Sequence, residues 1–195
     1  RGHQVTIFAS SFDRFTRKER FLQNGELYRL QVHDNVPFIW IKTYPYKENT
    51  PVRVWNMISF AHRFYRIALT RMKRPDVIIG SSPQPFAALA AQQVAAKLNV
   101  PFVLEIRDLW PQTLIDLGNF SPYHPFIVLL SEIERFLYQK AWYIITPLPK
   151  AGEYILEKGG DPNRILWIPN GVDFEIISTP VPPREKETFT IAYAG

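Results

Sequence analysis

No cysteine occurs in this chain, which excludes a disulfide scaffold and a thiolate metal site and fits a reducing compartment. The four histidines, His3, His33, His62 and His124, are scattered without metal-ligand spacing, so we expect no zinc site. No apolar run approaches the roughly 20 residues that cross a membrane, and no signal peptide is visible.

Motifs of several enzyme classes are missing as well. The chain has no G-x-G-x-x-G dinucleotide loop, no Walker sequence and no G-x-S-x-G elbow, and no Ser/His/Asp or Cys/His arrangement is visible. A phosphate-binding site would therefore be formed by helix N-termini or by residues outside this chain. The net charge of +5 is compatible with phosphate-bearing substrates, an anionic membrane or nucleic acid, but no nucleic-acid-binding signature favours the last.

What is present is a chain of 195 residues, 46% of them hydrophobic, with regular alternation of strands and helices from residue 75 on. Predicted strands lie at 76–80, 101–106, 141–146 and 164–168, and predicted helices at 84–98, 109–117, 125–140 and 148–158. Such alternation implies right-handed crossovers in a mostly parallel sheet. The predicted fold class is α/β, a Rossmann-like doubly wound domain.

Before residue 75 the pattern is less regular. A strand follows Gly2, 12–21 is a basic loop or short helix, and 27–32 and 36–43 are two further strands. Residues 52–74 form the clearest helix, with a polar stripe at 53, 56, 59, 63, 66, 70 and 73 opposite a broad apolar and aromatic face. This helix either packs on the sheet with its basic face in water or rests on an anionic membrane or a lipid-linked substrate, and the two are compatible.

Both ends indicate an excerpt from a longer protein. Gly2 is typical of a residue that ends a helix, and 189–195 is typical of a strand that meets a glycine turn. We expect the Rossmann-like domain to span 1–178, with its first strand and helix missing. Residues 179–188 would be a proline-rich linker, and 189–195 the first strand of a second domain.

The strand at 101–106 runs into a charged cluster formed by Glu105, Arg107 and Asp108, followed by Trp110. Ligands of parallel α/β sheets bind outside the carboxyl ends of the strands, so this cluster predicts a site. The alternative is a rim ion pair between Arg107 and Asp108 that caps the next helix.

Two serines, Ser81 and Ser82, stand at the predicted strand–helix junction on the same sheet edge. They would either cap the helix or contact a polyhydroxylated substrate.

Five segments together resemble the amino-terminal domain of a GT-B-fold glycosyltransferase of the group 1, or family 4, kind. They are R-G-H-Q-V at 1–5, G-S-S-P at 80–83, E-I-R-D-L-W-P at 105–111, I-I-T at 144–146 and I-P-N-G-V-D at 168–173. Their order along nearly the whole chain is that of the family. The D-L-W-P form is similar to the branch that builds bacterial O-antigen, capsule and exopolysaccharide on a lipid carrier.

The resemblance implies two Rossmann-like domains facing across a cleft, the first binding the acceptor and the second a nucleotide-sugar co-substrate. It implies a retaining hexosyltransferase without a bound metal, located in the cytoplasm at the inner face of the membrane. The partners would be the nucleotide-sugar, a glycan or polyprenyl-linked acceptor and, through 52–74, the membrane surface.

Matching residues take the family's roles as expectations. Arg107 and Asp108 are the catalytic candidates, and Arg107 stands where many relatives have a cleft-lining histidine. Because guanidinium stays protonated, Arg107 would bind a phosphate or sugar oxygen and would not act as a base. The acceptor-side candidates are Ser81, Ser82, Glu105 and Trp110, the last of which would offer a flat face to a sugar ring or pack in the core. Asn170 and Gly171 match the turn that leads to the linker on the donor side.

Other interpretations stay open at this point. One alternative is a nucleotide-sugar epimerase of GT-B fold, and another is a non-enzymatic Rossmann-like binding module. Under the glycosyltransferase interpretation, the nucleotide-sugar ligands lie outside this chain, so we expect the fragment alone to be inactive.

Overall fold

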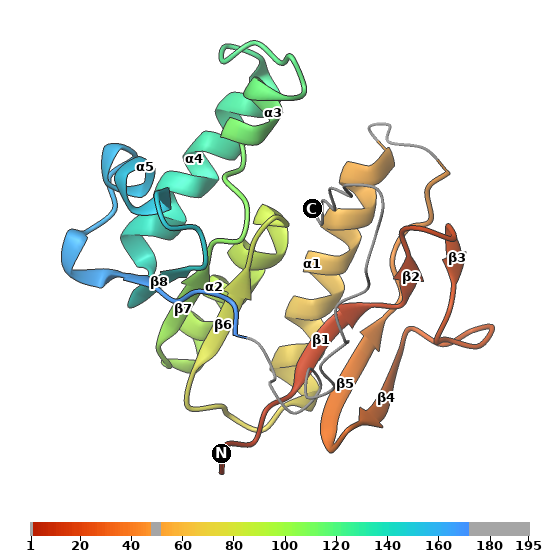
Figure 1. Ribbon diagram of the computed structural model, residues 1–195. Coiled ribbons are helices and arrows are strands. Elements are labelled where there is room, and N and C mark those ends of the chain that lie inside the picture. The colour runs from red at the N-terminus through yellow and green to blue at the C-terminus, as the bar shows by residue number, and fades with distance from the viewer. Residues whose placement is uncertain (1, 48–51, 172–195) are drawn as a thin grey trace, which may run out of the picture.

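The computed structural model describes residues 2–47 and 52–171 (Figure 1). These residues contain a three-stranded and a four-stranded sheet joined by a layer of helices, and a separate two-stranded ribbon. The first sheet has the strand order β1-β5-β4, from β1 (Ile7–Ser10), β4 (Tyr28–His33) and β5 (Val36–Ile41). Strands β1 and β5 are parallel, whereas β4 and β5 form an antiparallel hairpin. Its turn residues Asp34 and Asn35 have φ of 48° and 63°, as a tight two-residue hairpin turn requires.

The predicted basic loop or short helix at 12–21 is wrong. This segment is an antiparallel ribbon of two short strands, β2 (Phe12–Asp13) and β3 (Lys18–Glu19). Asp13 accepts hydrogen bonds from the backbone N–H groups of Phe15 and Thr16 and thereby shapes the turn between the strands. Such an aspartate turn favours chain reversal over helix.

Helix α1 (Val52–Arg71) confirms the predicted helix except for its last residues, but part of the predicted polar stripe faces inward. Asn56 is buried, and its Nδ2 donates to Thr43 Oγ1 at 2.8 Å and to the Tyr44 carbonyl at 2.7 Å. Arg63 donates to the Lys42 carbonyl. Among the described residues, no backbone N–H in a turn or loop bonds the Lys42 or Tyr44 carbonyl, and α1 side chains satisfy both.

The second sheet has four parallel strands in the order β6-β7-β8-β9. Strands β6 (Ile78–Ser81), β7 (Phe102–Glu105), β8 (Tyr143–Thr146) and β9 (Ile165–Trp167) alternate with helices α2 (Pro85–Leu98), α3 (Gln112–Asp116), α4 (Pro125–Lys140) and α5 (Ala151–Glu157), and a 3-10 turn (Pro162–Arg164) precedes β9. The predicted Rossmann-like α/β fold is confirmed. The predicted linker and second-domain strand lie outside the described residues.

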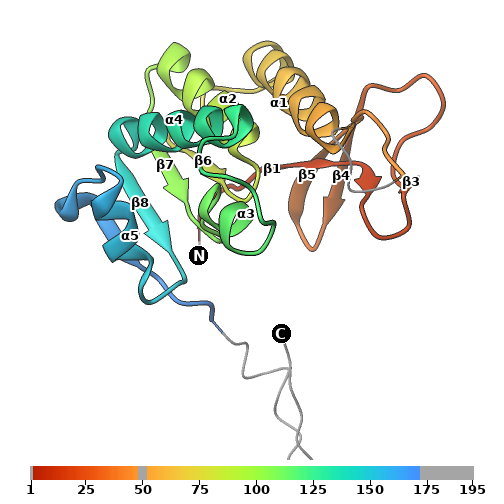
Figure 2. The ribbon, with the colours of Figure 1, turned by 90° about the horizontal axis from the view of Figure 1, so that it is seen from above.

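The crossover helices share one face of this sheet. Each strand is followed by its neighbour in the same direction, and right-handed crossovers then place every connecting helix on one side. Figure 2 shows α1, α2 and α4 as one layer across both sheets. Gly80 permits the close approach of α2, because a Cβ there would lie 2.9 Å from the Phe102 ring and 3.1 Å from the Ala88 Cα.

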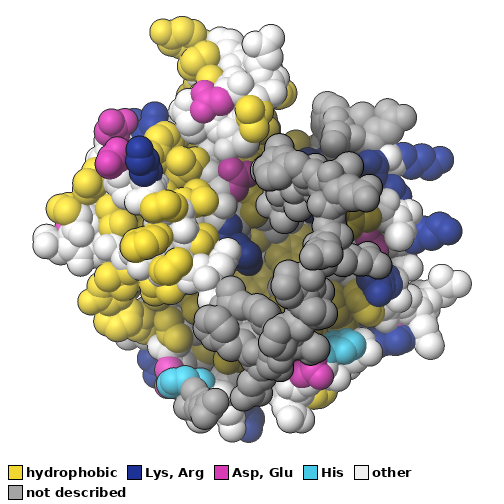
Figure 3. Space-filling view, viewed as in Figure 1, with side chains coloured by type: hydrophobic (Ala, Val, Ile, Leu, Met, Phe, Trp, Pro, Cys, Tyr) yellow, Lys and Arg dark blue, Asp and Glu magenta, His cyan; other side chains and the backbone are white. Residues whose placement is uncertain are grey.

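The opposite face of the sheet carries apolar side chains that are more open. Ile79, Val103 and Tyr143 form one row across it, and Ile79 is 57% exposed. Hydrophobic side chains cover much of the left part of the molecule in the view of Figure 3, whereas lysine and arginine side chains gather at its right edge. The site described next lies at the carboxyl ends of β6 and β7.

Candidate functional site

Two connections that leave neighbouring strands meet at the carboxyl edge of the second sheet. Ser81 at the end of β6 is the register partner of Glu105 at the end of β7, and the Ser82 N–H donates to the Glu105 carbonyl at 2.9 Å. The parallel register therefore brings the paired serines to the segment 105–110, as the sequence predicted.

Ser82 holds the backbone of the turn that follows β7. Its side chain is buried, and Oγ accepts hydrogen bonds from the backbone N–H groups of Arg107, at 3.1 Å, and Asp108, at 3.4 Å. The same hydroxyl donates to the Asp108 carbonyl at 3.1 Å. Helix α2 starts after Gln84 without a side-chain cap, so Ser82 does not cap it. With its hydrogen-bonding capacity used inside the protein, Ser82 is a support for the site.

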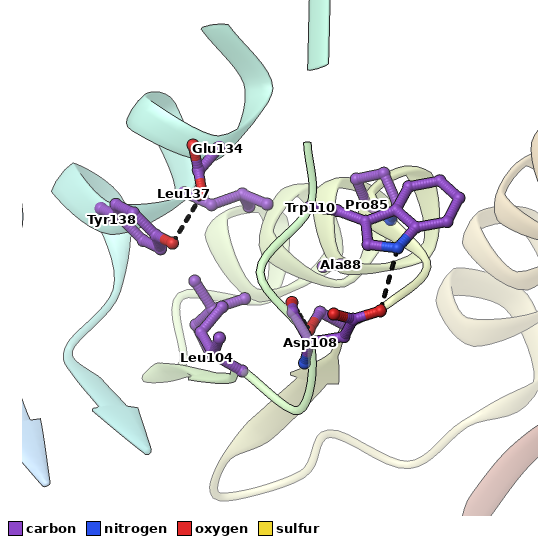
Figure 4. A pocket seen from close by; sticks show the side chains of 10 residues that line it. Pro85, Ala88, Leu104, Asp108, Trp110, Glu134, Leu137 and Tyr138 are labelled. Carbon is purple, nitrogen blue, oxygen red and sulfur yellow. Dashed lines mark hydrogen bonds between the residues drawn. The ribbon is translucent and has the colours of Figure 1, made fainter. Parts of the chain in front are cut away.

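Asp108 is half-buried, and each of its carboxylate oxygens accepts one hydrogen bond. Trp110 Nε1 donates to Oδ2 at 3.1 Å, and Thr113 Oγ1 donates to Oδ1 at 2.6 Å (Figure 4 shows the bond to Trp110). None of the ion pairs between described residues involves Arg107 or Asp108, so the predicted alternative of a rim ion pair is not what forms. Arg107, the residue before Asp108, is exposed.

Ser81 and Glu105 form a second polar pair at the same edge. Ser81 Oγ donates to Glu105 Oε2, and the two side chains share the sheet face opposite the helices with Ile145. Ser81 is exposed and Glu105 is half-buried, so this carboxylate is open to the surface. The site thus has two acidic side chains, one on each side of the sheet's end.

Trp110 has a cationic neighbour that the sequence did not indicate. The guanidinium carbon of Arg53, in the first turn of α1, lies 6.0 Å from the Trp110 ring centroid. A guanidinium at this distance is attracted by the aromatic ring. The helix pattern assigned Arg53 to a water-facing stripe, and only the fold places the start of α1 near the turn after β7. One surface of the Trp110 ring is therefore directed at a cation of the protein itself.

Beneath the turn lies a small cavity of about 20 Å³. Its polar lining comes from Ser82, Asp108 and Trp110 on one side and from Glu134 and Tyr138 of α4 on the other (Figure 4). A cavity of this size holds about one water molecule.

Glu134 is a buried carboxyl group that the sequence analysis missed. It is 6% exposed, and its oxygens accept hydrogen bonds from the Tyr138 hydroxyl at 2.8 Å and the Tyr154 hydroxyl at 3.2 Å. Burial raises the pKa of Glu134 to about 7, against the lowering effect of the two tyrosine hydrogen bonds. Burial beside Glu134 also raises the pKa of both tyrosine hydroxyls. The signal in the sequence was its place on α4 between Ile133 and Leu137, on the apolar side.

Asn170 and Gly171 are exposed and follow β9. No hydrogen bond between described residues joins them to the turn held by Ser82, and the rest of their motif, 172–173, lies outside the described residues. Their predicted role on the donor side stays a prediction.

Within residues 2–47 and 52–171, no group of three or more acidic or histidine side chains is placed to hold a metal ion. Nor is any helix in that part of the chain long and apolar enough to cross a membrane.

Comparison with known families gives one match that covers the whole site. A family model described as "Glycosyl transferase 4-like domain" matches residues 1–171 of the 195-residue chain. Comparison with curated proteins gave no match.

Proposed function

Since this chain belongs to the glycosyl transferase 4-like domain family, we propose that it is the acceptor-binding half of a retaining sugar transferase. The complete enzyme would transfer a hexose from a nucleotide-sugar to a lipid-linked or glycan acceptor in cell-surface polysaccharide synthesis of the O-antigen, capsule or exopolysaccharide type. The observation that carries the proposal is the turn at the carboxyl edge of β6 and β7, where the oriented carboxylate of Asp108 directly follows the exposed residue Arg107 in the chain.

The proposed chemistry divides between these two groups. In the transfer, the bond from the anomeric carbon to the donor phosphate breaks, the acceptor oxygen bonds that carbon, and the acceptor proton passes to the leaving phosphate. Asp108 would accept a hydrogen bond from the acceptor hydroxyl when the acceptor binds and so hold it in place, and the proton would turn from Asp108 to the leaving phosphate as the new bond forms. Arg107 would bind a phosphate oxygen, where a fixed positive charge stabilises the developing negative charge. The residues that bind the nucleotide-sugar would come from a second domain. The proposed transfer would require no bound metal.

The remaining acceptor-side candidates receive revised proposals from their contacts. Glu105 and Ser81 form an accessible carboxylate–hydroxyl pair that suits hydrogen bonding to sugar hydroxyls. Trp110 would orient Asp108 and stack on Arg53, and it would contact a sugar only with the remaining part of its ring. Ser82 would act through the backbone of the turn.

Peripheral contact with the inner face of the cytoplasmic membrane is part of the proposal. On α1, Trp55 is 62% exposed, and Arg66, about three turns further along the same side of the helix, is exposed as well, which suits an anionic lipid surface. Asn56 and Arg63 do not belong to that surface, because they bond the chain after β5. Weaker sedimentation of Trp55→Ala with anionic vesicles would support α1 as the contact, and unchanged sedimentation would exclude it.

The test of function is transfer of a radiolabelled sugar by the full-length protein, with membranes as the source of acceptor. We expect label in the lipid or glycan fraction and none with residues 1–195 alone. An epimerised nucleotide-sugar without transfer would favour the epimerase alternative. Micromolar binding of a nucleotide-sugar to residues 1–195 would contradict the assignment of donor binding to a second domain, and no reaction with any donor would favour a binding module.

A further inference from the structure

Thr113 reaches the Asp108 carboxylate from the first turn of α3, although nothing in its sequence context distinguishes it from any other polar residue of a short helix. The Oγ1–Oδ1 distance is 2.6 Å, which is the length expected of a hydroxyl that donates to an ionised carboxylate. We propose that Thr113 is a positioning residue, which together with Trp110 fixes the direction of the Asp108 carboxylate for the transfer reaction. This inference rests on the proposed function, in which Asp108 receives the acceptor hydroxyl.

The two donors act on opposite oxygens of one carboxylate. Trp110 Nε1 holds Oδ2 at 3.1 Å, and Thr113 holds Oδ1. A carboxylate accepts about four hydrogen bonds, two at each oxygen. One acceptor position on each oxygen thus remains for a ligand, and rotation of the side chain would break both existing bonds.

The backbone of the same residue is held separately. Ser82 accepts from the Asp108 N–H and donates to its carbonyl, and that carbonyl also accepts from the Trp110 backbone N–H at 3.1 Å. The Thr113 hydroxyl and the Trp110 indole contact only the Asp108 side chain. The attachment and the direction of the carboxylate therefore depend on different groups. Loss of the Thr113 hydroxyl should leave the turn in place and release one carboxylate oxygen.

A competing structural role is visible and can be separated. The Thr113 hydroxyl also lies 3.1 Å from the Leu109 carbonyl, so it ties the start of α3 to the preceding turn. If that tie were its only role, its loss would lower stability and would not depend on the presence of the Asp108 carboxylate. If Thr113 acts through Asp108, the effects of removing either one should not add.

The experiment measures kcat and KM of the full-length enzyme with Thr113→Val, which keeps the side-chain shape, and Thr113→Ser, which keeps the hydroxyl. We expect Thr113→Val to lower kcat about tenfold with KM changed less than about twofold, and Thr113→Ser to keep at least about half of the wild-type kcat. In an Asp108→Ala background, Thr113→Val should lower kcat no further. Thr70→Val is the matched control, because the Thr70 hydroxyl on α1 bonds only the Arg66 carbonyl in the described chain.

Wild-type kcat in Thr113→Val, or equal losses in the valine and serine variants, would overturn the inference. So would a further loss in the Asp108→Ala background. If Thr113→Val does not fold, Trp110→Phe removes the second donor, keeps an aromatic ring, and is judged by the same non-additivity with Asp108→Ala. Full activity of Asp108→Ala would instead defeat the proposed role of Asp108, while a normal Asp108 effect without a Thr113 effect would defeat only this inference.

Discussion

Two acidic residues line one small cavity from opposite sides (Figure 4), and the surroundings of their carboxyl groups differ. Asp108 lies in a turn at the sheet edge, is half-buried and adjoins the exposed Arg107. Glu134 lies on α4 within the core, and both its hydrogen-bond donors are tyrosine hydroxyls. A carboxylate with free acceptor positions near the surface can receive a ligand hydroxyl, whereas an enclosed one serves the packing of its helix. The difference teaches that burial and donor identity, more than residue type, separate a site carboxylate from a structural one.

The largest expected effect is the dependence of the unfolding free energy on pH, which the buried Glu134 causes. The pKa of Glu134 is about 7 in the folded protein against an ordinary value of 4.5. Below pH 4.5 it is protonated in both states, and between pH 4.5 and 7 the unfolded state ionises first, so stability falls as pH rises. The full loss, reached above pH 7, is roughly 3 kcal/mol. Urea unfolding from pH 4 to 8 should show this slope, and Glu134→Gln should flatten it. An equally steep slope in Glu134→Gln would show that other titrating groups cause the pH dependence of stability.

The next-largest effect concerns Asp108, the half-buried carboxyl group of the two. Asp108→Ala in the full-length enzyme should lower turnover at least about tenfold, or about 1.4 kcal/mol of barrier, because the attacking hydroxyl loses its acceptor. The assay is sugar transfer to the lipid-linked acceptor. Glu132→Ala, on the exposed side of α4, serves as the control and should keep wild-type turnover. If Asp108→Ala also retained it, Asp108 would be as structural as Glu134.

The smallest expected effect concerns the hydrogen bonds from the two tyrosines to Glu134. Tyr154→Phe removes the 3.2 Å hydrogen bond to Glu134 Oε2 and should cost about 1 kcal/mol of unfolding free energy. The loss should be larger at pH 8 than at pH 4, because the bond lowers the pKa of Glu134 and so favours its charged form. Tyr123→Phe, at a side chain that is 89% exposed, should change nothing. Equal losses at both pH values would show that Tyr154 contributes packing alone.

Much of the fold follows from local pattern. Helix α4 spans 125–140 as predicted, because Pro125 suits a first helical turn and its apolar residues recur at helical spacing. Asn99 ends α2 in the left-handed conformation with φ of 51°, at the residue where the pattern placed the end. In contrast, the turn at 13–16 depends on side-chain bonds from Asp13, and helical and ribbon patterns look alike over so few residues.

The site was predicted in part. Placing Ser81, Ser82, Glu105 and Asp108 at one edge required only the parallel order of β6 and β7. Their roles were less accessible, since an exposed and a buried serine look identical in sequence. Ser82 supports the backbone, while Ser81 stays open to the surface.

By itself, the sequence determined the α/β alternation, most helix bounds and the strand ends that carry polar residues, because backbone propensity and hydrophobic period are local properties. Only the tertiary structure decided that Arg53 lies over Trp110, that Asn56 faces inward, and that Thr113 and Trp110 hold Asp108 while two tyrosines hold Glu134. These contacts depend on crossing angles, rotamers and solvent exclusion between segments distant in the chain. Those quantities are set when helices pack on the sheet, and no local pattern contains them.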